Sequence, residues 1–263
     1  MLTNITELLE FLRSLGVEPK KGLSQNFLID GNIVHKIVAQ ADIQVGDHVL
    51  EIGPGPGALT EALVLKGAHV FAVEKDVIYA EALKRFSLVE VFAQDIRDFD
   101  FSLLPSRTKV VANLPYHLTA PILTLLAPHH ELFTSLTLMV QEEVARRITA
   151  QPHSKEYGSL TVFLNFYSTP RYAFKVSRHC FYPQPNVDSA IVSLNLKQPP
   201  AVDAEAFFTF VRTAFQHRRK MLTTTLGHSL GPLLTQLGVN PKARPEELSL
   251  ETFLDLFRLN SAK

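Results

Sequence analysis

The segment from Val49 to Gly57 constrains the possible folds more tightly than any other part of the chain. A short apolar run ends in an acidic residue, three glycines follow at alternate positions, and a helical pattern of apolar residues begins at Ala58. Glycine is needed where the backbone bends sharply or lies against a ligand, and a helix N-terminus offers unpaired N–H groups. The segment therefore predicts a buried strand, a tight turn and a helix beside a ligand. Pro54 and Pro56 stiffen the turn but each removes one N–H donor, so the turn suits a ligand held by shape better than a pyrophosphate.

A second apolar run, 70–73, ends in Glu74. In folds with a glycine turn of this kind, a carboxylate at the tip of the second strand binds ribose hydroxyls. The distance from the glycine turn favours this role for Glu74 over that of a solvated charge. The glycine spacing alone also fits dinucleotide-binding proteins, so a dehydrogenase that uses NAD is an alternative at this point.

Strand and helix patterns then alternate, which predicts a doubly wound α/β sheet with ligands at the carboxyl ends of its strands. Strands are expected at 48–52, 69–74, 88–92, 109–112 and 135–140, and helices at 58–66, at 77–85, through 122–126 and from about 141. Two later segments, 172–176 and 190–196, bracket a proline-rich loop. They are expected to form a hairpin that closes the sheet antiparallel.

The two ends of the chain differ from this core. A helix is expected from about Ile5 to Leu15, followed by a basic, glycine-containing arm at 19–30 that docks by its apolar end. Gln198-Pro199-Pro200 marks a linker, and the remainder reads as short helices broken by glycine and proline. We predict two domains: 1–199, a Rossmann-like catalytic domain with the N-terminal arm, and 200–263, a small all-helical domain.

Composition indicates the cellular compartment and restricts the classes of partner that the protein can bind. The sequence has no apolar run of about 18 residues, no secretory signal and a single cysteine, Cys180. We therefore expect a cytoplasmic protein with no membrane span, no disulfide framework and no metal site. The 26 Lys and Arg residues balance 26 Asp and Glu residues, so nucleic-acid binding requires basic residues gathered locally. Basic clusters occur at 20–21, 146–147, 171–178 and 218–220.

The strongest chemical signal is Asn113-Leu114-Pro115-Tyr116, which follows the strand at 109–112. The exocyclic amine of a nucleobase is a poor nucleophile because its lone pair is delocalised into the ring. The side-chain oxygen of Asn113 and the carbonyl preceding or within Pro115 could accept both amine hydrogens and free that lone pair. Tyr116 offers a flat face on which the base can stack, worth about 1–3 kcal/mol, once the base has left its helix or loop. We therefore predict methylation of an amino group, catalysed mainly by positioning and electrostatics.

Two further side chains are weaker candidates. Phe181 begins the loop at 181–189 and could stack on the base opposite Tyr116, although an aromatic plug at the end of the hairpin is the better explanation when Phe181 is taken alone. Asp95 follows the strand at 88–92 and could accept from the adenine amine of a cofactor. Capping the next helix explains Asp95 nearly as well.

Together these motifs resemble the ribosomal RNA adenine dimethyltransferase family of the KsgA (RsmA) type. The resemblance extends from about Pro19 to about Lys220 and is specific because six motifs occur in order and at the right spacing. The motifs are Gln25–Leu28, Glu51–Gly57, Glu74, Asp95, Asn113–Tyr116 and Phe181–Ser189. Phe215 with Arg218-Arg219-Lys220 matches the C-terminal signature of that family.

The resemblance implies S-adenosylmethionine as the methyl donor and dimethylation of two adjacent adenosines in the 3′-terminal hairpin loop of 16S rRNA. The partner would be the small ribosomal subunit or its precursor, the enzyme a monomer, and the wider role ribosome biogenesis. The residues expected to contact the cofactor are Asn26, Leu28, Gly53, Gly55, Glu74, Asp95 and Asn113. Those expected to frame the adenine are Asn113, Leu114, Pro115, Tyr116 and Phe181. Those expected to contact RNA are Lys20, Lys21, Arg218, Arg219 and Lys220, of which the last three could instead brace the helical domain.

Three alternatives lie close to this prediction. Methylation of large-subunit rRNA, the antibiotic-resistance activity, is related chemistry, and the Phe215–Lys220 signature favours the small subunit. DNA adenine methylases usually have an acidic residue where this chain has Asn113. A non-catalytic RNA-binding or assembly factor on the same fold is disfavoured by the intact Asn113–Tyr116 segment.

Overall fold

The structure is a computed structural model that describes residues 2–19 and 25–261. The chain divides into two compact units, Met1–Ala145 with Thr169–Lys197 and Arg146–Ser168 with Gln198–Lys263. The predicted boundary at residue 199 differs from this division by two residues at 198–199 and by the segment 146–168, which belongs to the second unit. This segment contains α7 (Ser159–Tyr167), whose residues are apolar around most of the helix. It therefore lacks the one-sided pattern by which a surface helix is predicted.

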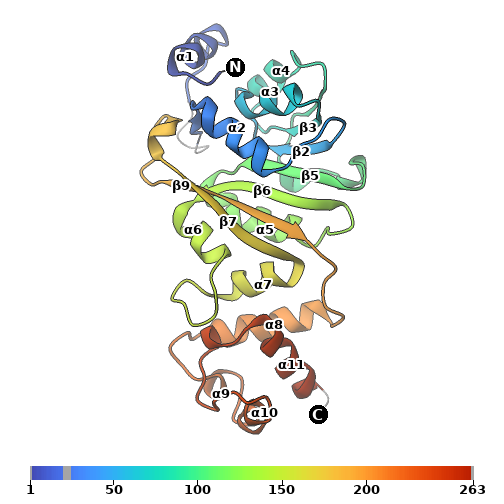
Figure 1. Ribbon diagram of the computed structural model, residues 1–263, viewed down its shortest axis with the longest axis vertical. Helices are drawn as coiled ribbons and strands as arrows, with labels where there is room; N and C mark the ends of the chain where they lie inside the picture. The colour runs from blue at the N-terminus through green and yellow to red at the C-terminus, as the bar shows by residue number, and fades with distance from the viewer. Residues whose placement is uncertain (1, 20–24, 262–263) are drawn as a thin grey trace. The chain divides into compact units, whose positions relative to one another are not determined.

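A seven-stranded sheet organises the first unit (Figure 1). Its strands are β2 (His48–Ile52), β3 (His69–Val73), β4 (Val89–Phe92), β5 (Thr108–Asn113), β6 (Phe133–Gln141), β7 (Ser168–Val176) and β9 (Ser189–Leu196). The strand order is β4-β3-β2-β5-β6-β9-β7. Strands β2 to β6 pair in parallel and β9 pairs antiparallel with β6. The predicted doubly wound sheet and its antiparallel closure are confirmed.

The order of the strands locates the site. The chain leaves β2 for β3 on one side and later crosses to β5 on the other, so the direction of winding reverses between β2 and β5. In open α/β sheets, ligands bind at the carboxyl ends of the strands where this reversal occurs. The glycine turn follows β2 and Asn113 ends β5, so both motifs lie at that point.

Helices cover both faces of the sheet (Figure 1). Residues of α2 (Gly31–Gln40), α3 (Ala58–Leu65) and α4 (Val77–Leu83) form one core with alternate strand residues such as Val49, Val111 and Met139. This alternation follows from the period of two along a strand. Helix α5 (Thr119–Leu126) lies on the opposite face and buries Ile122 and Leu123.

The N-terminal segment packs on the first unit by two contacts. Helix α1 (Ile5–Ser14) is capped by Asn4 and buries Leu8 and Leu12 against Phe27 and Tyr79. Strand β1 (Phe27–Leu28) pairs antiparallel with β8 (Phe181–Tyr182), with Leu28 opposite Phe181. The remaining elements of this unit are α6 (Glu142–Ile148), which runs on into the second unit, η2 (Ile96–Asp98), η3 (Phe101–Leu103), η4 (Tyr116–Leu118) and η5 (Arg178–Cys180).

The second unit is helical, as expected for the C-terminal part. Besides α7 it contains α8 (Ala204–Phe215), α9 (Leu222–Thr225), α10 (Leu230–Gln236), η6 (Pro245–Glu247) and α11 (Leu250–Ser261). Its core is aromatic: the centre of the Phe207 ring lies 5.5 Å from the ring centres of both Phe166 and Phe257. Within the ranges 2–19 and 25–261, no helix has the length and apolar character needed to cross a bilayer.

Candidate active site

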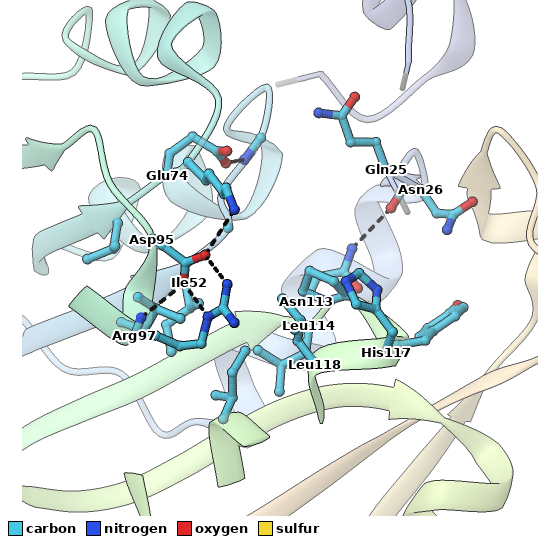
Figure 2. A pocket seen from close by; sticks show the side chains of 18 of the residues that line it. Gln25, Asn26, Ile52, Glu74, Asp95, Arg97, Asn113, Leu114, His117 and Leu118 are labelled. Atoms are coloured by element: carbon cyan, nitrogen blue, oxygen red, sulfur yellow. Dashed lines mark hydrogen bonds and ion pairs between the residues drawn. The ribbon is translucent and has the colours of Figure 1, made fainter. Parts of the chain in front are cut away.

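A cavity of about 180 Å³ opens at the carboxyl ends of β2, β3 and β5 (Figure 2). Side chains from the N-terminal arm, the glycine turn, the ends of β3 and β4, and the segment after β5 line it. The structure therefore brings together most of the site residues predicted from the sequence. These are Asn26, Gly53, Gly55, Glu74, Asp95, Asn113, Leu114, Pro115 and Tyr116.

The glycine turn presents bare backbone to this cavity. Gly53, Gly55 and Gly57 have φ angles of 65°, 55° and 92°, a region that side chains disfavour. A Cβ at Gly57 would lie 2.8 Å from Leu83, and one at Gly55 would lie 3.0 Å from the Phe27 ring. A Cβ at Gly53 would meet no atom within 4 Å and would occupy free space at the cavity wall. Packing thus requires two of the glycines, and the third leaves room for a ligand.

Arg85 fixes the shape of the turn, a role that the sequence analysis missed. Its guanidinium donates to the carbonyl oxygens of Pro56 and Ala82, each at 2.7 Å. The same group lies 4.2 Å from the ring centre of Phe86 and 4.8 Å from that of Phe11. Burial lowers the pKa of Arg85. Nothing local in the sequence signals this contact, because Pro56 and Arg85 meet only through the fold.

Glu74 ties the end of β3 to the glycine turn. It is 7% exposed, and its two carboxylate oxygens accept from the backbone N–H groups of Gly55 at 2.9 Å and Asp76 at 2.8 Å. Burial raises the pKa of Glu74, while these two bonds act in the opposite direction. Glu74 therefore holds the turn in place, and its carboxylate keeps acceptor capacity beside the cavity that the residue lines.

Asp95 is the centre of a small charged cluster (Figure 2). Arg97 donates to both of its oxygens, at 3.0 and 2.7 Å, and Lys75 donates at 3.1 Å. Asp95 also caps η2 by accepting from the Arg97 backbone N–H. These bonds, that of the Arg97 guanidinium above all, hold the pKa of Asp95 well below its usual range. The capping alternative is thus observed, and Lys75 and Arg97 are cavity residues that the sequence analysis did not identify.

The segment after β5 has the opposite character, because it leaves two acceptors free. The Asn113 side-chain nitrogen donates to the Asn26 carbonyl at 3.1 Å, and its Oδ1 has no partner among the described residues. The Pro115 carbonyl accepts from the Leu118 N–H at 2.9 Å. The Leu114 carbonyl has no such donor among the described residues, while the Leu114 N–H donates to Met139. The sequence did not decide between the carbonyls of Leu114 and Pro115 as the second acceptor. The structure favours the Leu114 carbonyl, because that of Pro115 already accepts a hydrogen bond.

Tyr116 is held at the edge of the cavity by its hydroxyl. The Tyr116 and Ser189 hydroxyls lie 2.9 Å apart, and Ser189 is fully buried at the start of β9. Burial raises the pKa of Tyr116, so the phenol stays neutral. The hydrogen bond fixes the ring while its face lines the cavity.

Two predicted site residues do not line this cavity. Leu28 and Phe181 are 6% and 3% exposed and belong to the core beneath α2 and α3. Pairing of β1 with β8 places Leu28 opposite Phe181, and both side chains pack in this core. Contact of these two residues with cofactor or base stays a prediction. Of the predicted RNA contacts, Lys20 and Lys21 lie outside the described residues.

The basic run 218–220 lies in the second unit. Arg218 donates to the carbonyls of Lys155 at 2.7 Å and Tyr157 at 2.8 Å, so it braces a loop of that unit. Arg219 and Lys220 are exposed. The bracing alternative thus holds for Arg218.

Comparison with known proteins identifies the family of this chain. A family model described as "Ribosomal RNA adenine dimethylase" matches residues 17–261. The chain belongs to this family. It is an S-adenosylmethionine-dependent rRNA adenine dimethyltransferase. The dimethylase is 56% identical to the ribosomal RNA small subunit methyltransferase A of Protochlamydia amoebophila, over 96% of this chain and 95% of that protein. It is 48% identical to the protein of the same name from Chlamydia caviae, over 97% of each chain.

Solved structures show the same fold for the dimethylase. A dimethyladenosine transferase from Plasmodium falciparum superimposes with a TM-score of 0.75 at 26% identity, over 89% of this chain and 98% of that one. The 23S rRNA methyltransferase ErmE superimposes with a TM-score of 0.71, also at 26% identity and with the same coverage. The predicted family and fold are thereby confirmed.

Proposed function

We propose that this dimethylase transfers methyl groups to the exocyclic amines of two adjacent adenosines in the 3′-terminal hairpin loop of 16S rRNA, two methyls to each. The observation that carries the proposal is the pair of acceptors at Asn113 and Leu114, which have no partner among the described residues and lie beside a cavity that fits a nucleoside cofactor. The relatives that are 45–56% identical carry small-subunit names, which favours the small-subunit substrate.

The cavity residues fit S-adenosylmethionine. Gly53 leaves free space where a side chain would project, Glu74 offers carboxylate lone pairs for ribose hydroxyls, and Asn26 lies beside Asn113. Asp95 would accept from the adenine amine of the cofactor, with Arg97 and Lys75 keeping its carboxylate ionised. When bound, the cofactor supplies the methyl group as an activated sulfonium, so no strong base is needed.

The chain's own contribution is to hold the target base. The amine of an extruded adenine donates one hydrogen to Asn113 Oδ1 and the other to the Leu114 carbonyl. Two acceptors on different sides draw the nitrogen out of conjugation and localise its lone pair. Amide oxygens are weak bases, so the proton that the amine loses after transfer passes to water. Tyr116 stacks on the base, and its bond to Ser189 keeps the ring from turning.

RNA binding in the second unit would fall to Arg219 and Lys220, since Arg218 is engaged with two carbonyls. A ribosomal substrate implies a cytoplasmic enzyme that acts during small-subunit biogenesis. We expect it to act as a monomer, and sedimentation at micromolar concentration tests this.

The proposal is tested by a radiolabelled methyl assay on small subunits purified from cells lacking this protein. We expect about four methyl groups per subunit, all on two neighbouring adenosines of the 3′ hairpin when the rRNA is mapped. Labelling of large-subunit rRNA instead would favour methylation of 23S rRNA, the activity for which ErmE is named. Binding to subunits without transfer would favour an assembly factor.

A further inference from the structure

A second cavity, of about 720 Å³, lies in the first unit at the opposite edge of the sheet. It is lined by the end of α2, the starts of β2, β5 and β6, and parts of β7 and β9. The parallel strands are about five residues long, so roughly 17 Å separates it from the methyl-transfer site. The proposed transfer chemistry makes no use of it.

The sheet face changes character along the strands on the side that α2 covers. Towards the methyl-transfer edge, Met139 pairs with Ile191, and both belong to the apolar core. Towards the other edge, Thr137 pairs with Ser193 and Ser135 with Asn195, on the same face because strand residues alternate. Since α2 ends at Gln40, these polar residues line the second cavity instead of packing under the helix.

One hydroxyl of this lining is buried without a partner among the described residues. Thr137, which also lines the cavity, is 2% exposed. The Thr134 hydroxyl, at an irregularity in the pairing of β5 with β6, is buried without a partner. A buried hydroxyl without a partner costs free energy unless a ligand or water meets it. The cavity is thus equipped to bind a polar molecule.

The charges at the cavity favour an anion. Arg107 and Arg171 are exposed at its rim, and neither has an ion-pair or hydrogen-bond partner among the described residues. Of the two carboxylates in the lining, Asp47 pairs with Lys109 at 2.8 Å, whereas Asp42 accepts from the neutral Gln44 amide at 2.8 Å and keeps its charge. Two arginines and one lysine therefore face two carboxylates, and the lining has a net positive charge although the whole chain is neutral.

We propose that this cavity binds a ribose-phosphate segment of the rRNA substrate, away from the base that is methylated. Arginines bind phosphate oxygens in a forked geometry, while hydroxyl and amide groups bind sugar hydroxyls and phosphates. The set of Arg107, Arg171, Ser193, Asn195 and Thr137 offers both kinds of contact. This inference rests on the proposed rRNA substrate and adds a second point of contact on the catalytic unit.

The test is the salt dependence of binding to unmethylated small subunits. Each lost phosphate contact lowers the slope of log K against log salt by roughly 1. We expect the double variant R107A/R171A to lose about 2 from this slope and to bind subunits about tenfold more weakly near 0.15 M salt. The double variant K66A/K84A, which removes equal charge from exposed positions outside the cavity, should behave as wild type.

Further measurements test the proposal independently of the salt dependence. Binding of S-adenosylmethionine should be unchanged in R107A/R171A, and the subunit KM should rise while kcat stays constant. If that variant does not fold, N195D, which places a carboxylate at the cavity, should weaken subunit binding alone. A salt slope equal to that of wild type overturns the proposal. A second result would also overturn the proposal: inorganic phosphate stabilises the wild-type protein, and R107A/R171A abolishes this stabilisation without changing RNA binding. The cavity would then be a site for small anions. Binding is read without methyl transfer, so failure of the proposed reaction leaves this result readable.

Discussion

Two sides of the methyl-transfer cavity use their polar groups in opposite ways. On the side of β3 and β4, the carboxylates of Glu74 and Asp95 are engaged by backbone N–H groups, Arg97 and Lys75. On the side of β5, Asn113 Oδ1 and the Leu114 carbonyl have no partner among the described residues. On one side, protein groups already hold the carboxylates, which keep acceptor capacity for the cofactor. On the other side, the two acceptors gain partners only from a ligand.

This difference separates positioning from chemistry. The engaged carboxylates fix the glycine turn and the charge around the cofactor, so their loss should weaken cofactor binding. Free acceptors gain their partners only when the substrate amine enters, so their loss should slow transfer.

Asn113→Ala removes a free acceptor and should lower kcat by about 10²–10³-fold, the range found when one preorganised hydrogen-bonding group is removed from an active site. Affinity for S-adenosylmethionine should change by less than about fivefold, because the cavity loses only one of its contacts. Single-turnover methyl transfer and calorimetric titration of the cofactor measure the two effects. Equal losses in both would remove the distinction between the two sides.

Glu74→Ala removes a carboxylate that holds the glycine turn, and should act on cofactor binding. The N–H groups of Gly55 and Asp76 would lose their acceptor, and hydrogen bonds to a charged group contribute about 1.5–3 kcal/mol. We expect the Kd for S-adenosylmethionine to rise about 10–100-fold, with kcat at saturation reduced much less. The matched variant Glu74→Gln keeps one acceptor oxygen and should fall between Ala and wild type. A loss of kcat at saturating cofactor would place Glu74 in the chemistry.

Glu51 is a third acid, which neither holds the glycine turn as Glu74 does nor lines the methyl-transfer cavity. It is 1% exposed, its Oε2 has no partner in the described structure, and burial raises its pKa to about 8. The unfolded chain loses this proton near pH 4.5, so the stability that the group contributes is complete below that pH. It is lost as the pH rises towards 8, at up to about 1.4 kcal/mol per pH unit.

Glu51→Gln should therefore remove one component of the pH dependence of unfolding. Urea titrations from pH 5 to 9 should show the free energy of unfolding of wild type falling relative to that of the variant as the pH rises. Parallel curves would mean that Glu51 is ionised in the folded protein at neutral pH.

Tyr116→Phe should have the smallest effect, because it removes one hydroxyl and keeps the stacking face. Loss of the bond to Ser189 costs about 0.5–1.5 kcal/mol, equivalent to roughly a 2–10-fold fall in kcat/KM. Tyr116→Ala also removes the stacking, so its fall should be larger. Equal falls for Phe and Ala would mean that the ring does not contact the base.

The strands and the glycine turn could be predicted because their signals are local. An apolar run that ends in an acid, or glycines at alternate positions, needs no knowledge of distant residues. Asn113 was also predictable, since its place after a strand fixes it at the edge of the sheet. The choice between the carbonyls of Leu114 and Pro115 was not, because it depends on the turn that brings the Leu118 N–H to Pro115.

The features that the sequence did not reveal arise where two distant segments meet. Leu28 and Phe181 turn inward because β1 pairs with β8, a register that no local pattern encodes. Arg85 reaches Pro56 only through the packing of α4 beside the glycine turn. Arg218 belongs to a basic run typical of RNA contacts, yet the fold directs it to two carbonyl oxygens. In each case the deciding partner is distant in the sequence.

Whether Asn113 accepts a hydrogen of the substrate amine is tested most directly by single-turnover methyl transfer, with Asn113→Asp compared with Asn113→Ala. Aspartate keeps an acceptor oxygen at this position but cannot donate to the Asn26 carbonyl, whereas alanine can do neither. If acceptance of the amine hydrogens drives transfer, Asn113→Asp should retain a rate at least tenfold above that of Asn113→Ala at saturating cofactor. Equal rates for the two variants would contradict the account and show that Asn113 acts only through its bond to Asn26.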